Sequence, residues 1–155
     1  MDRLGIYLND HLAGSTTGRE LAKRTLSSNR GTEFEPMLEW LVEQIAEDRE
    51  ALVGIMRTLE VPQDPVKKLA AWAVERIGRL KLNGALLSYS PLSRLVELEG
   101  LTLGVTGKLA GWRALQQISD PRLAAFDLEQ LAERALEQQQ RLEEHRLAAA
   151  RLALV

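Results

Sequence analysis

The fold is decided by the stretch TEFEPMLEWLVEQIAEDREALVGIMRTL, residues 32–59. Its apolar side chains recur every three or four residues, which places them along one face of an α-helix. Thr32 followed by Glu35 has the spacing of a capping box, and Pro36 suits the first helical turn. The sequence therefore predicts a helix over about residues 33–60 with one buried face. That face consists of Leu38, Leu41, Ile45, Leu52, Ile55 and Leu59.

Three further helix starts are marked by a capping residue directly before a proline, at residues 64–65, 90–91 and 120–121. The helices that begin at the second and third of these signals each carry one more apolar face. These faces are Leu95, Leu98, Thr102, Val105, Leu109 and Trp112, and then Leu128, Leu131, Ala135, Leu142, Ala149 and Leu152. Four helices are long, ~39 to 50 Å at ~1.5 Å per residue. Helices of that length bury their apolar faces against one another, so we expect an all-α antiparallel four-helix bundle with a shorter connecting helix, forming one domain over residues 1–155. The expected helices span about residues 2–27, 33–60, 65–82, 91–118 and 121–153.

Composition excludes several classes of protein. The chain has 155 residues, 45% of them apolar, with 20 basic and 22 acidic side chains, which is typical of one soluble domain. It has no cysteine, so disulfides and cysteine-bound metals are excluded, and its two histidines are too few for a three-histidine zinc site. Without a basic stripe or a long uncharged run, we expect a cytoplasmic protein that binds neither nucleic acid nor membrane.

Polar residues interrupt the apolar faces at His11, Asp48, Gln138 and His145, and Glu99 lies beside one of them. A buried polar group without a partner costs about 1 to 3 kcal/mol, so each should have one. One interpretation is a metal site built from His11, Asp48, Glu99 and His145. Counting residues from the helix centres places these four at different levels, and we expect two local pairs instead, His11 with Asp48 and His145 with Glu99. No cofactor is expected.

Glycines recur on one face of the helix expected at 91–118, and each costs ~1 kcal/mol relative to alanine inside a helix. Either two helix backbones approach closely there, or the glycines line a groove for a ligand or a partner helix. We expect close packing, with Gly104 and Gly107 against a backbone near Gly14 and Gly18, or against a second subunit. The candidate binding residues are Gly100, Gly104, Gly107 and Gly111.

Two long helices, a connecting segment and two further long helices resemble the ferritin-like superfamily. The stretches EQIAED (43–48), LVELEG (95–100) and EQQQRLEEH (137–145) are similar in character. Di-iron members of that superfamily carry Glu-x-x-His on two helices. Here Leu8 and Leu142 stand three residues before His11 and His145. The resemblance implies the fold without iron chemistry, as in a bacterial group that lacks the di-iron ligands.

Two functions remain open from the sequence. The glycine faces and the tryptophans Trp40, Trp72 and Trp112 favour a non-enzymatic helical-bundle protein that acts by self-association, as a homodimer, or by binding a protein partner. The alternative is a divergent ferritin-like metal-binding protein or oxidoreductase that uses carboxylate and histidine ligands. Whether the protein is an enzyme is not decided by these residues, and elemental analysis would separate the two functions.

Overall fold

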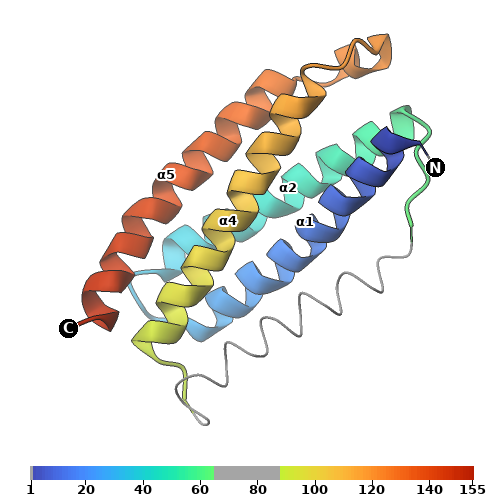
Figure 1. Cartoon of the computed structure of the whole chain (residues 1–155). Helices are drawn as coiled ribbons and strands as arrows, with labels where there is room; N and C mark the ends of the chain where they lie inside the picture. Colours follow the sequence, from blue (N-terminus) through green and yellow to red (C-terminus); the bar gives the residue numbers. More distant parts are fainter. Residues whose placement is uncertain (1, 65–87) are drawn as a thin grey trace.

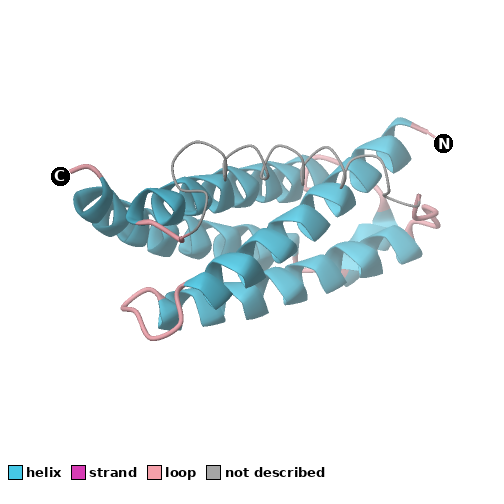
Figure 2. Ribbon diagram, turned by 90° about the horizontal axis from the view of Figure 1, so that it is seen from below, coloured by secondary structure: helices cyan, strands magenta, loops and turns pink. Residues whose placement is uncertain are grey.

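The computed structural model describes residues 2–64 and 88–155, and within those ranges the chain is helical and has no strand (Figures 1 and 2). The all-α prediction is confirmed for them. None of the described helices is long and apolar enough to cross a bilayer. The helix expected at 65–82, its start at Pro65 and Trp72 lie outside the described residues. The elements are α1 (Arg3–Ser28), α2 (Glu35–Thr58), α4 (Pro91–Leu115), the 3₁₀-helix η1 (Pro121–Ala125) and α5 (Leu128–Ala153).

Each long helix packs against one or two of the others. Successive helices α1 and α2 contact each other, as do α4 and α5, and α1 also packs against α4. Arg24 of α1 pairs with Glu97 near the start of α4, and His11 lies against Gly111 near its end. The two helices therefore run in opposite directions, side by side in Figure 1.

The helix starts follow the sequence signals in part. Ser90 and Ser93 form a capping box before α4, with Pro91 in the first turn, as predicted. Thr32 and Glu35 do not form one. The Thr32 hydroxyl donates to the Asn29 carbonyl (2.7 Å) inside the preceding turn, so α2 begins only at Glu35, whose carboxylate accepts from the Gly31 N–H (2.7 Å).

The prediction that the last long helix begins at Pro121 is wrong. Asp120 caps η1, a short 3₁₀-helix that buries Leu123. The chain then becomes extended at Phe126, and α5 starts at Leu128 with Asp127 as its cap, the Asp127 carboxylate accepting from the Gln130 N–H (2.9 Å). The start of α5 is therefore set by Asp127, six residues after Pro121, and not by Asp120.

The expected apolar faces form the core with three exceptions, Thr102, Leu128 and Leu152. All six members of the α2 face are buried, and five of the six on α4 are, Thr102 being half-buried. On α5, Leu152 is 52% exposed, which contradicts its expected place in the core, and Leu128 is half-buried. The buried row passes from Ala149 to Ala153, four residues on, so Leu152 is turned away from it.

Candidate functional site

The expected pair of His11 and Asp48 does not form. The His11 ring packs edge-on against Tyr7, with centroids 4.5 Å apart, and covers Gly111. Burial lowers the pKa of His11 from its ordinary value of 6.5, and nearby Asp10 opposes that shift only in part. His11 is therefore an uncharged side chain at neutral pH, and it serves as packing rather than as the partner of a carboxylate.

Asp48 is buried and paired, as expected, but its partners are other residues. Only 2% of it is exposed. Its Oδ2 accepts hydrogen bonds from Lys108 Nζ (2.6 Å) and Gln138 Nε2 (2.8 Å), and Arg134 Nη2 lies 3.2 Å from its Oδ1. Lys108 also donates to Gln138 Oε1. These four residues, the Asp48 cluster, join α2, α4 and α5 through one carboxylate.

Sequence reasoning missed Lys108 and Arg134 although a signal for both was present. Lys108 stands three residues after Val105 and four before Trp112, so it shares the buried face of α4. Arg134 stands four residues before Gln138 on α5 in the same way. A cation on the apolar face of each neighbouring helix is the expected partner for a carboxylate buried on the third.

The pair of His145 and Glu99 does not form either. His145 Nδ1 lies 2.8 Å from the Arg141 carbonyl oxygen, and the ring meets Phe34 edge-on. Glu99 pairs instead with Arg146, the residue after His145 on α5, with 3.7 Å between Glu99 Oε1 and Arg146 Nη1. One residue rotates a helix by ~100°, which is enough to exchange one partner for the other.

The four candidate metal ligands, His11, Asp48, Glu99 and His145, thus each contact a different set of residues and do not meet at one point. In the part of the chain that the structure describes, no three histidine, aspartate or glutamate side chains come together in a way that could hold a metal ion.

Among the described residues, Gly104 and Gly107 do not pack against the α1 backbone near Gly14 and Gly18, and the other expected contact, with a second subunit, stays a prediction. An added Cβ at Gly104 or Gly107 would meet nothing within 4 Å among the described residues, and the same holds for Gly14 and Gly18 on α1. Only the ends of the face are filled. At Gly100 a Cβ would lie 3.1 Å from Leu21 Cδ2, and at Gly111 it would lie 2.8 Å from His11 Cε1. Two side chains, not two backbones, make the contact.

Between those two contacts lies a cavity of about 380 Å³, the α1–α4 groove. Gly14 and Gly18 line it from α1, and Gly104 and Gly107 line it from α4, so each wall has two positions without a side chain. Most of the remaining lining is apolar, and α2 contributes to it. Other members of the lining are Ile45, Asp48, Arg49, Leu52, Leu101, Leu103, Val105, Lys108 and Trp112.

Polar contacts fix the chain at both ends of this groove. Near the start of α1, Asn9 donates to the Pro62 carbonyl (3.1 Å) and accepts from the Asp64 N–H (2.9 Å).

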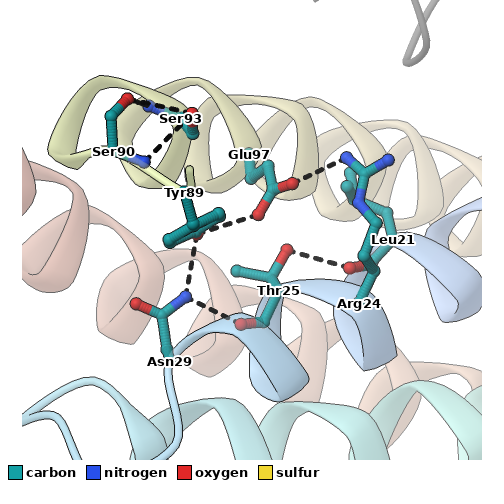
Figure 3. Close-up of polar contacts among 8 residues, drawn as sticks. All are labelled: Leu21, Arg24, Thr25, Asn29, Tyr89, Ser90, Ser93 and Glu97. Atoms are coloured by element: carbon teal, nitrogen blue, oxygen red, sulfur yellow. Dashed lines mark hydrogen bonds and ion pairs between the residues drawn. The ribbon is translucent and has the colours of Figure 1, made fainter. Parts of the chain in front are cut away.

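At the other end, the Tyr89 hydroxyl donates to Glu97 (2.9 Å) and accepts from Asn29 (2.8 Å), as Figure 3 shows. Burial raises the pKa of Tyr89, so this hydroxyl keeps its proton at neutral pH. Arg24 pairs with the same Glu97 from α1 (2.7 Å). These contacts hold the segments that lead out of α2 and into α4 against α1.

Comparison of the chain with protein-family models, curated proteins and solved structures gives no significant match.

Proposed function

We propose that the protein is a non-enzymatic helical-bundle protein that acts by self-association, and that a second copy docks on the α1–α4 groove. The observation that carries this proposal is an exposed leucine side chain beside two glycines that line the groove. Leu103 is 75% exposed on the rim of the groove, and an added Cβ at Gly104 or Gly107 beside it would meet no atom of residues 2–64 and 88–155 within 4 Å. A surface with both features is complementary to itself.

A two-fold contact uses the same surface on both subunits. In such a dimer Leu103 of each copy enters the groove of the other and packs over Gly104 and Gly107. Burying a leucine side chain fully stabilises by about 1.5 to 3 kcal/mol, and symmetry counts the contact twice. That gain offsets the ~1 kcal/mol that each glycine costs within its helix.

The finer architecture belongs to the same proposal. We infer an antiparallel four-helix bundle of the ferritin-like type, supported by the opposite directions of α1 and α4. The contact of Glu47 with Arg134 at 2.7 Å and of Phe34 with His145 supports the same relation for α2 and α5. The metal-binding alternative gains no support from the described residues, because its candidate ligands contact other groups.

Sedimentation equilibrium of the wild type and of Leu103→Ser tests self-association. We expect the wild type to be a dimer at micromolar concentration and Leu103→Ser to be a monomer with the same helical content. The matched control is Leu136→Ser, because Leu136 on α5 is 44% exposed but is not part of the groove lining, and it should remain a dimer. A monomeric wild type, or equal masses for both variants, would contradict the proposal.

A further inference from the structure

Hydrogen-bond donors without acceptors line one part of the α1–α4 groove. Trp112 is 3% exposed, and its indole N–H has no partner among the described residues. Arg49 Nε is likewise buried and unpaired. Lys108 carries three N–H donors, and two of them are taken by Asp48 and Gln138. A buried donor left unsatisfied is costly, so the Trp112 indole N–H and Arg49 Nε each need an acceptor. Lys108, whose side chain is 17% exposed, has one further N–H to donate.

Two of these donors share one face of α4, and the third comes from α2 in the lining of the same groove. Lys108 and Trp112 are four residues apart, which stacks them on one face of α4. Arg49 follows Asp48 on α2, and Asp48 bonds to Lys108. All three line the groove.

The buried charges near these donors are unbalanced. Asp48 is one carboxylate in contact with two cations, Lys108 and Arg134. The pKa of Lys108 is lowered, chiefly because burial disfavours its charged form, although Asp48 opposes this. Glu47, the other acid on Arg134, is 57% exposed and remains solvated. Asp48 Oδ1 accepts no hydrogen bond, and the exposed Asp10 also lines the groove, so acids and bases are both present there. A bound carboxylate would supply the acceptor that the Trp112 indole and Arg49 Nε lack.

The rest of the groove is suited to an alkyl chain. Its glycine walls are open between Leu21 and His11, and leucine and isoleucine side chains lie around them. A volume of about 380 Å³ lies within the range of small-molecule sites, about 300 to 1,000 Å³.

We propose that the α1–α4 groove binds a long-chain monocarboxylic acid, with the carboxylate accepting from Lys108, Arg49 and the Trp112 indole N–H and the alkyl chain lying along the glycine walls. This site goes beyond self-association and does not require it. Acid and second copy use the same groove, so decanoate has to displace the second copy wherever the chain is a dimer, and the titrations and spectra are recorded in the Leu103→Ser background as well as in the wild type.

Decanoate below its micellar concentration is the probe, titrated by calorimetry, and decyltrimethylammonium is the cationic control of equal chain length. We expect decanoate to bind one per chain and the cation to bind at least tenfold more weakly. Trp112→Phe removes one N–H and keeps the ring, so it should weaken decanoate binding about tenfold, as for a hydrogen bond to a charged acceptor. Trp40→Phe is the matched control, because Trp40 packs under Arg141 and is not part of the groove lining, and it should bind as the wild type does.

A second measurement does not depend on how a variant folds. The indole N–H resonance of Trp112 in the wild type should shift on addition of decanoate and should not shift with the cation. Equal binding of the two probes, or equal affinity of the two tryptophan variants, would mean an apolar groove without an anion site. Absence of decanoate binding would mean that water or another part of the chain satisfies these donors. Each of these results overturns the proposal.

Discussion

At the scale of single residues, the Asp48 cluster gives the sharpest prediction about stability. Asp48→Ala leaves Lys108 and Arg134 beside a cavity without a carboxylate, and removing one member of a buried ion pair costs about 3 to 5 kcal/mol. Urea unfolding measures that loss. Glu47→Ala removes the exposed acid on the same Arg134 and should cost less than ~1 kcal/mol. Equal unfolding midpoints for the two variants would show that Asp48 is solvated.

His11 makes stability depend on pH in a predictable direction. Its folded pKa lies below the unfolded value of 6.5, so between those two values the unfolded chain binds more protons. The free energy of unfolding should therefore be highest above pH 6.5 and should fall as the pH decreases toward the folded pKa. His11→Gln removes the titrating group, and urea unfolding from pH 7.5 to 5 should give a flatter profile for this variant. Parallel profiles for variant and wild type would disprove the role of His11.

At the scale of the helix, two glycines of α4 should respond to the same substitution with different results. At Gly104 an added methyl group meets open space, so Gly104→Ala should stabilise by up to ~1 kcal/mol through helix propensity. At Gly111 the new Cβ would lie 2.8 Å from the His11 ring, and relieving that clash costs about 1 to 3 kcal/mol. Thermal melting of dilute protein should place Gly104→Ala above Gly111→Ala. The reverse order would mean that α1 and α4 are arranged differently.

At the scale of the whole molecule, the sequence predicts where helices lie better than it predicts which residues meet. Periodicity alone identifies the buried face of α2, and the position of Asp48 between Ile45 and Leu52 predicts its burial. Its partners could not be found by counting residues along the axes, because counting fixes height and leaves rotation free. For that reason His11 was paired with a carboxylate it does not contact.

The cost of the glycines is visible in the sequence, but what offsets that cost is not. The low helix propensity of Gly104 and Gly107 indicates that some other interaction offsets their cost in free energy. It does not show whether that interaction is a closely packed backbone or a ligand or partner in a groove. The distinction depends on Leu21 and His11, two side chains of another helix that hold the ends of the interface. Likewise, Asp120 and Asp127 both resemble a cap, and only the packing of Leu123 selects the second for α5.

Chemical cross-linking across the dimer tests the central claim most directly, because the chain has no cysteine of its own. Ser15→Cys and Gly107→Cys proteins, which both keep Leu103 and carry the new thiol in the groove lining, are mixed and treated with a short bis-maleimide, and the product is analysed by mass spectrometry. A two-fold contact through the α1–α4 groove predicts efficient coupling between residue 15 of one copy and residue 107 of the other, and little coupling of either to Leu136→Cys. Coupling of residues 15 and 107 that is no better than coupling to residue 136 would contradict the account.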